Sequence, residues 1–77
     1  MQFFDWTIEM PSSLKPYIDM EHKRMAILTT EDDEIHIALE FDEHQHLVMR
    51  PRWNINITIL GEKHLKFTTN SRNIPQI

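Results

Sequence analysis

The sequence predicts a mainly β protein with about five antiparallel strands in a meander, which form a small barrel or roll. Two observations support this fold class. Apolar and polar residues alternate along three long segments, as they do in strands that bury one face. These segments are also rich in the β-branched and aromatic residues that strands favour. With 77 residues, the chain has room for a single domain.

The candidate strands follow from the positions of the apolar residues. The alternating segments and three shorter apolar runs lie, in chain order, at residues 4–10, 25–29, 35–41, 47–49, 53–59 and 65–67. In the first segment the alternation places Phe4 inward. From residue 25 onward nearly all inward positions have odd numbers, so we expect Trp53 and Ile59 in the core and His36 on the polar face.

Two prolines limit the strand assignment. Residues 12–24 are the only stretch that the pattern allows as a helix, at most a short one, because Pro16 follows early and the apolar spacing is weakly helical. Pro51 has no amide hydrogen to donate, so it marks a strand edge, a bulge or a bend. We expect one β-rich domain over residues 1–70 and a polar C-terminal tail at residues 71–77.

The connections between strands are expected to leave the inward-facing residues at odd numbers from one strand to the next. A two-residue hairpin loop without a bulge would reverse this inward parity, whereas a loop of three or five residues, or a bulge, preserves it. The candidate three-residue loops lie at residues 31–33, 43–45 and 61–63. At the last of these, Gly61-Glu62 alone could form a tight turn, so we predict either the wider loop or a bulge there.

Composition excludes several classes of protein. The chain contains no cysteine, which excludes disulfides and thiolate metal sites and suits a reducing compartment, so we expect a cytoplasmic protein. The first ten residues carry two acids and no base, unlike a signal peptide. The longest apolar run, residues 53–61, falls far short of the roughly 20 residues that span a bilayer, so no membrane association is expected.

The net charge of −4 is unevenly distributed. Residues 1–43 contain eleven acids and three bases, a net −8, whereas residues 44–77 contain one acid and five bases, a net +4. Six carboxylates near the predicted loops are the candidate partner-binding residues: Glu31, Asp32, Asp33, Glu34, Asp42 and Glu43. Such a surface either serves solubility and edge protection or complements a basic partner.

The function that we predict is that of a small acidic protein-binding module, which acts stoichiometrically as an inhibitor, immunity protein or adaptor. The expected partner is a protein with a basic surface, such as a nucleic-acid-processing protein whose groove is lined with Lys and Arg. Size and charge fit regulators of phages or mobile elements, by analogy only. The sequence does not determine the oligomeric state.

Two other functions fit parts of the sequence. Four basic residues are the candidates for a single-stranded nucleic-acid-binding surface on a small β-barrel: Arg50, Arg52, Lys63 and Lys66. Placing Trp53 in the core removes the aromatic platform that base stacking needs, so a nucleic-acid partner is disfavoured. Alternatively, an exposed edge strand or the tail would make the protein a subunit of a homo-oligomeric structural assembly.

No site for catalysis or for a cofactor is predicted. His44 and His46 would point to the same side of an extended chain and are the candidate half-site for a metal. No third ligand can be assigned to them, so no metal is expected. The sequence has no nucleophile elbow, no cysteine nucleophile and no glycine-rich phosphate loop. We therefore expect a protein that is not an enzyme and uses no cofactor.

Overall fold

The computed structural model describes residues 1–69 and confirms the mainly β fold. These residues form eight strands and no helix. In chain order the strands are β1 (Gln2–Phe3), β2 (Trp6–Glu9), β3 (Leu14–Asp19), β4 (Arg24–Thr29), β5 (Ile35–Phe41), β6 (Leu47–Pro51), β7 (Asn56–Gly61) and β8 (His64–Thr68). The predicted tail at residues 71–77 lies outside the described residues.

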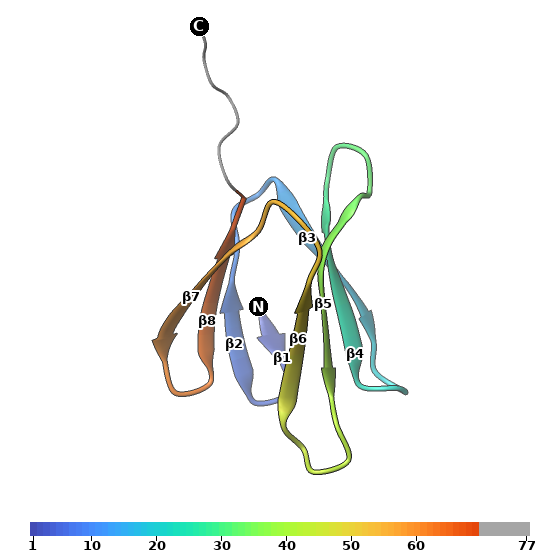
Figure 1. Cartoon of the computed structure of the whole chain (residues 1–77), viewed down its shortest axis with the longest axis vertical. Coiled ribbons are helices and arrows are strands. Elements are labelled where there is room, and N and C mark those ends of the chain that lie inside the picture. Colours follow the sequence, from blue (N-terminus) through green and yellow to red (C-terminus); the bar gives the residue numbers. More distant parts are fainter. Residues whose placement is uncertain (70–77) are drawn as a thin grey trace, which may run out of the picture.

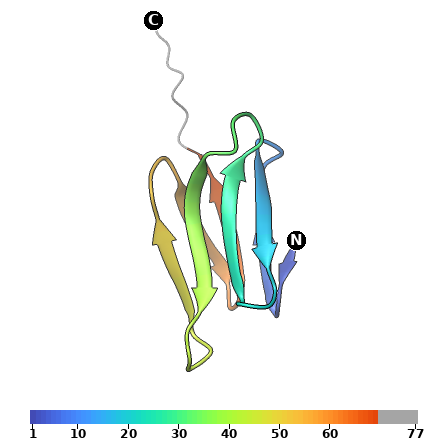
Figure 2. The ribbon, with the colours of Figure 1, turned by 90° about the vertical axis from the view of Figure 1, so that its right-hand side faces the viewer.

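The strands form two four-stranded sheets, which we call the first and the second sheet (Figure 1). The second sheet has the order β3-β4-β5-β6 and is an antiparallel meander, as the sequence predicts (Figure 2). The first sheet has the order β1-β2-β8-β7, in which parallel pairing of β2 with β8 joins two hairpins. Strands from opposite ends of the described chain therefore lie side by side, which no alternation within one segment reveals.

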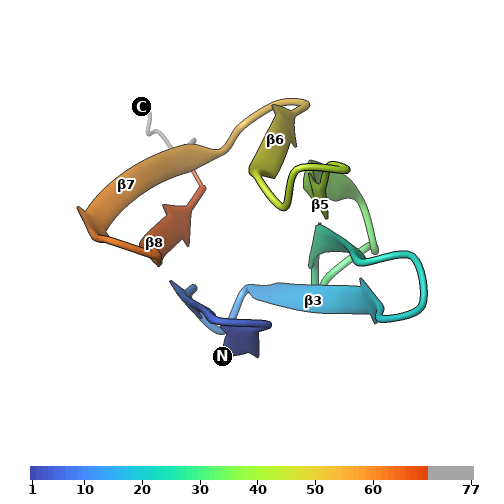
Figure 3. The same cartoon turned by 90° about the horizontal axis from the view of Figure 1, so that it is seen from below.

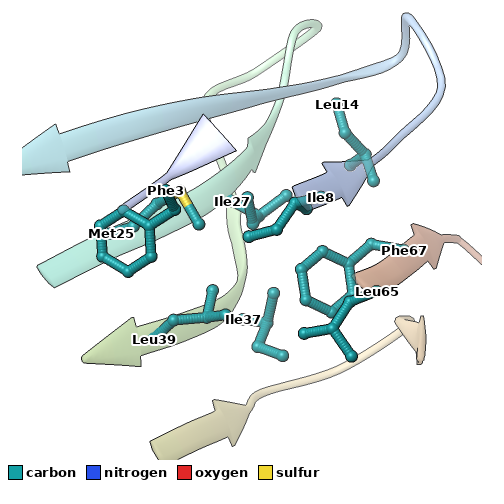
Figure 4. Packing of buried hydrophobic residues seen from close by; sticks show 9 residues of the cluster. All are labelled: Phe3, Ile8, Leu14, Met25, Ile27, Ile37, Leu39, Leu65 and Phe67. Carbon is teal, nitrogen blue, oxygen red and sulfur yellow. The ribbon is translucent and has the colours of Figure 1, made fainter. Parts of the chain in front are cut away.

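The two sheets face each other around one apolar interior (Figure 3). Within residues 1–69 no pairing joins a strand of one sheet to a strand of the other, so the barrel is not closed. Nine buried apolar residues from both sheets fill the interior (Figure 4): Phe3, Ile8, Leu14, Met25, Ile27, Ile37, Leu39, Leu65 and Phe67. Their burial is the main stabilising contribution, at about 25 cal/mol per Å² of apolar surface removed from water.

The odd-number rule holds for the central strands except at His36, which is buried, and it also fails at Trp53 and Ile59. β4, β5 and β8 bury the expected residues Met25, Ile27, Ile37, Leu39, Leu65 and Phe67. Trp53, however, is 47% exposed, because it lies in the connection between β6 and β7, where strand alternation does not apply. Ile59 is 73% exposed. It pairs with buried Leu65 and shares its face, but β7 is an edge strand and leaves the side chain uncovered.

Near the N-terminus, the buried position also differs from the one that the alternation predicts. Phe3 is buried instead of Phe4, because β1 ends at Phe3 and a turn follows it before β2 begins. Phe4 lies in this turn with a φ of 56° and is 38% exposed. The expectation of an inward Phe4 was therefore wrong, since it assumed one continuous strand.

Residues 12–24 form a short turn, β3, the turn that follows it and the first residue of β4, and the helix that the sequence allowed is not present. Pro16 lies within β3, which pairs on one side only, with β4. An edge strand tolerates the missing amide hydrogen of proline. Pro51 ends β6 at the other edge of the same sheet, which confirms its assignment to a strand edge.

Two of the three predicted connections are confirmed. Residues 43–45 form a three-residue loop between β5 and β6, closed by a hydrogen bond of 3.0 Å from the amide of Asp42 to the carbonyl of His46. Gln45 completes this loop in the left-handed region, with a φ of 65°. Between β7 and β8 the register shifts at Leu60, which is the predicted bulge.

The connection between β4 and β5 differs from the expected three-residue loop at residues 31–33. The amide of Thr29 donates to the carbonyl of Glu34 at 3.0 Å and closes a four-residue loop, residues 30–33. The inward parity is restored by a β-bulge in β5, because Ile27 pairs with Ile37 while Leu28 pairs with Ile35. His36 is the extra residue of this bulge, and its side chain turns into the interior.

Candidate functional site

The candidate site lies at the end of the second sheet where the β4–β5 loop and the β6–β7 connection meet, uppermost in Figure 1. A shallow depression of about 320 Å³ is lined there by Asp33, Glu34, Ile35, Arg52 and Trp53. We call this feature the Trp53 depression. It combines two carboxylates, one guanidinium group and a half-exposed indole ring.

His36 holds the segment that carries Trp53. The Nδ1 atom of His36 lies 2.9 Å from the carbonyl oxygen of Trp53, and this ring nitrogen must donate because a carbonyl oxygen only accepts. The backbone amide of Arg52 donates to the carbonyl of His36 at 2.8 Å. The imidazole and indole rings stack with centroids 4.8 Å apart and an interplanar angle of 27°. One face of the indole is thus supported by the protein.

His36 itself is 1% exposed. Its Nε2 atom has no hydrogen-bond partner within residues 1–69. The side chain is therefore a buried support for Trp53.

The alternation of apolar and polar residues could not identify His36 or Trp53 as parts of the candidate site. Because inward positions were expected at odd numbers, His36 was placed on the polar face. Only the bulge in β5 turns it inward. For Trp53 one signal was present, because Pro51 marks a break and β7 begins only at Asn56. An assignment that ended the strand at the proline would have left Trp53 in a connection.

The carboxylates of the β4–β5 loop divide into two groups. Asp32 accepts a hydrogen bond of 2.5 Å from the Thr29 hydroxyl, which holds the pKa of Asp32 below its ordinary value. Asp33 forms an ion pair of 2.5 Å with Lys15 and has a φ of 58°. These two side chains shape and fix the loop. Glu31 and Glu34 are exposed, and no ion pair within residues 1–69 involves them.

Asp42 and Glu43 lie at the opposite end of β5, about 24 Å away at the usual rise of a strand. Asp42 accepts hydrogen bonds from the amides of His46 at 2.8 Å and His44 at 2.9 Å. Both hydrogen bonds lower the pKa of Asp42, and the bond from the His46 amide has the larger effect. The six predicted acidic residues therefore do not form one surface, because two of them belong to a distant turn.

The four predicted basic residues do not form one surface either. Arg50 pairs with Glu40 at 3.1 Å on the second sheet, and Lys66 lies on β8 of the first sheet. Lys63 forms an ion pair with Asp5, which raises the pKa of Lys63 and lowers that of Asp5. Of the four, only Arg52 lies beside the exposed indole.

The rings of His44 and His46 have centroids 6.1 Å apart in the β5–β6 loop. Each lies near a carboxylate, His44 at 3.6 Å from Glu43 and His46 at 3.8 Å from Asp42. Among residues 1–69, no group of three or more His, Cys, Asp or Glu side chains is arranged to hold a metal ion. The same residues contain no helix with the length and apolar character to cross a membrane.

Comparison with known proteins gave no similarity on which to base a function. No family model matches the chain, and no significant match was found among curated proteins or solved structures. The fold and the site define an open, two-sheet β roll with an aromatic and acidic depression at one end.

Proposed function

We propose that this protein is a small acidic binding module of the inhibitor, immunity or adaptor type, which binds a basic protein partner stoichiometrically through the Trp53 depression. The observation that supports the proposal is the half-exposed indole of Trp53, fixed by His36 beside the β4–β5 loop. Tryptophans that are both exposed and held in place are typical of residues that dominate binding energy at protein interfaces.

The chemistry of the depression favours a cationic side chain. The face of an indole attracts Lys and Arg, and carboxylates nearby add to that attraction. Asp33 and Glu34 line the depression with Trp53, and Glu31 is in the same loop. Arg52 and the Asp33 partner Lys15 contribute two opposing charges. The excess of carboxylates therefore comes from Glu31 and Asp32 in the same loop. This mixture suits an Arg or Lys side chain from the partner that carries its own acidic neighbour.

The arrangement also lowers the cost of binding. Ordering a flexible side chain at an interface opposes association, so a residue that is already fixed binds more tightly. Trp53 is fixed by stacking and by the hydrogen bond that its own carbonyl accepts from His36. The β4–β5 loop is fixed by Asp32 and Asp33.

These contacts narrow the set of residues expected to touch the partner. Asp32 and Asp33 are engaged in holding the loop, so their replacement would disturb its shape as well as its charge. Asp42 closes the distant turn. We propose that Glu31, Glu34 and Trp53 make the contacts, with Asp32 and Asp33 positioning them.

The test maps the binding site of a basic probe, nona-arginine, on the full chain by amide chemical-shift changes. The proposal predicts saturable changes concentrated at residues 31–36 and 52–53 and at the Trp53 indole. Changes of equal size at residues 42–46 would contradict it, because a diffuse attraction to all carboxylates would then account for binding. High salt should weaken the interaction in either case, so the location of the changes is the informative result.

One observation supports a second function, that of a homo-oligomeric subunit. β7 is an edge strand without a charged residue, and Ile59 and Leu60 on it are 73% and 46% exposed. The other edges are protected, since β1 has two residues, β3 contains Pro16 and β6 ends at Pro51. Edge strands without such protection pair readily with another strand. A second copy of β7 is the proposed occupant, because an uncharged strand pairs with itself without repulsion.

A further inference from the structure

A second cavity lies at the end of the molecule opposite the Trp53 depression. It occupies about 650 Å³ between the turns of the first sheet and the β5–β6 hairpin of the second sheet. Figure 1 shows the hairpin turns of both sheets at this lower end. We call this cavity the end cleft. Its volume falls within the range of about 300–1,000 Å³ that is typical of sites for small molecules.

Aromatic rings form the apolar wall of the end cleft. Phe4, Trp6 and Phe41 line it, together with Leu47. The rings of Phe4 and Phe41 meet edge to face with centroids 5.3 Å apart, and buried Phe3 contacts both, at 5.1 and 5.4 Å. The wall is therefore supported from the core and remains open to solvent.

Phe4 is held at this wall by an unusual backbone conformation. Its φ of 56° lies in the left-handed region, which a bulky side chain seldom adopts. The side chain is still 38% exposed, so the conformation does not serve to bury the ring in the core. The ring lines the end cleft instead.

The rim of the end cleft carries positive charge, although the protein as a whole is acidic. Lys23 and Lys63 line it beside the imidazole of His46, against the single acid Asp5, which pairs with Lys63. Lys23 is exposed, and no ion pair within residues 1–69 involves it. The backbone carbonyl of Lys23 accepts a hydrogen bond of 3.2 Å from the amide of Phe41, which fixes Lys23 next to the aromatic wall.

We propose that the end cleft binds a small amphiphilic anion, with an apolar body and one carboxylate or sulfonate head group. The body packs against Phe4, Trp6 and Phe41, and the head group binds the ammonium group of Lys23. An anion is favoured because Lys23 has no acidic partner, while an apolar body is favoured by the aromatic wall. This site is independent of the Trp53 depression and does not rest on the function proposed for it.

The first test uses 8-anilinonaphthalene-1-sulfonate as the probe, with folding of every variant checked by circular dichroism. The proposal predicts saturable one-to-one binding, which Lys23→Glu weakens about tenfold. Lys66→Glu is the matched control, because it changes the net charge equally on β8 outside the cleft and should change affinity by less than about twofold. Equal losses in the two variants would overturn the proposal.

The second test fixes the polarity of the ligand and its location. Dodecanoate below its critical micelle concentration should displace the probe, whereas dodecyltrimethylammonium, with the same chain length and the opposite charge, should not. In a Trp53→Phe background the remaining indole is Trp6, so dodecanoate should shift its emission. Displacement by the cation, or an unchanged Trp6 emission on saturation with dodecanoate, would contradict the site.

Discussion

At the scale of single residues, His36 links the core to the proposed contact site. The bulge in β5 turns it inward, where it is 1% exposed, stacks on Trp53 and donates to the Trp53 carbonyl. A buried polar group without a partner is costly, and Nε2 of His36 has none within residues 1–69. A fully apolar ring would avoid that cost but could not donate to the carbonyl. The histidine therefore fits a role in positioning Trp53.

His36→Ala should lower the free energy of unfolding by roughly 2–4 kcal/mol, because it leaves a cavity and an unsatisfied carbonyl oxygen. Urea unfolding followed by circular dichroism measures this loss. His36→Phe keeps the ring contact and removes the unpartnered nitrogen, so it should cost less than the alanine variant. An alanine variant as stable as the wild type would contradict the anchoring role of His36.

Asp42 should make stability depend on pH in the acidic range. The amides of His46 and His44 hold its pKa below the ordinary value of 3.8. In the unfolded chain the Asp42 carboxyl takes up its proton near its ordinary pKa, whereas in the folded protein it does so only at lower pH. The hydrogen bonds to Asp42 therefore stabilise the fold fully above the ordinary pKa. This stabilisation is lost as the pH falls through the lower pKa of the folded state. The stability difference between wild type and Asp42→Ala, measured by urea unfolding, should be larger at pH 7 than at about pH 2.5. A difference that does not change with pH would contradict this assignment.

At the scale of elements, β7 is the strand whose environment is least complete. It pairs with β8 on one side only, and Ile59 remains exposed although its neighbour Leu65 is buried. Antiparallel pairing of two β7 strands about Thr58 would place Ile57 of one copy opposite Ile59 of the other. Such a contact would extend the apolar face of the first sheet across both molecules.

Ile59→Lys should dissociate this dimer, because it places two charges in the shared strand pair. Light scattering coupled to size exclusion should show a concentration-dependent dimer for the wild type and a monomer for the variant. Tyr17→Lys is the matched control, since Tyr17 is 72% exposed on the edge strand β3, and it should leave the dimer intact. A wild type that stays monomeric at millimolar concentration would exclude self-association through β7.

The elements also show how far sequence reasoning reaches in this protein. Alternation identified β4, β5 and β8 with their buried residues, and parity predicted the 43–45 loop and either a wider loop or a bulge between β7 and β8, where the structure has a bulge at Leu60. These features depend on local geometry, which the sequence records directly. The parallel pairing of β2 with β8 and the bulge at His36 depend on contacts between distant segments. No local period carries that information, so the parallel pairing and the burial of His36 could not be predicted, whereas the break at Pro51 was a usable signal for the position of Trp53.

At the scale of the whole molecule, the two ends of the roll differ in chemistry. One end carries the Trp53 depression with its excess of carboxylates, and the other carries the end cleft with Lys23 and Lys63. The charge asymmetry between the two halves of the sequence is not a separation of faces. Pairing of β5 with β6 places Arg50 against Glu40, so acidic and basic residues are interleaved on the second sheet.

The central claim is that a basic partner binds at one end of the molecule, and the most direct measurement compares two charge reversals. Calorimetric titration with nona-arginine at low salt is carried out on Glu34→Lys and Glu43→Lys, which change the net charge equally at opposite ends of β5. We predict that Glu34→Lys weakens binding about tenfold and Glu43→Lys less than about threefold. Equal weakening by the two substitutions would show that binding follows net charge alone and would contradict a site at the Trp53 depression.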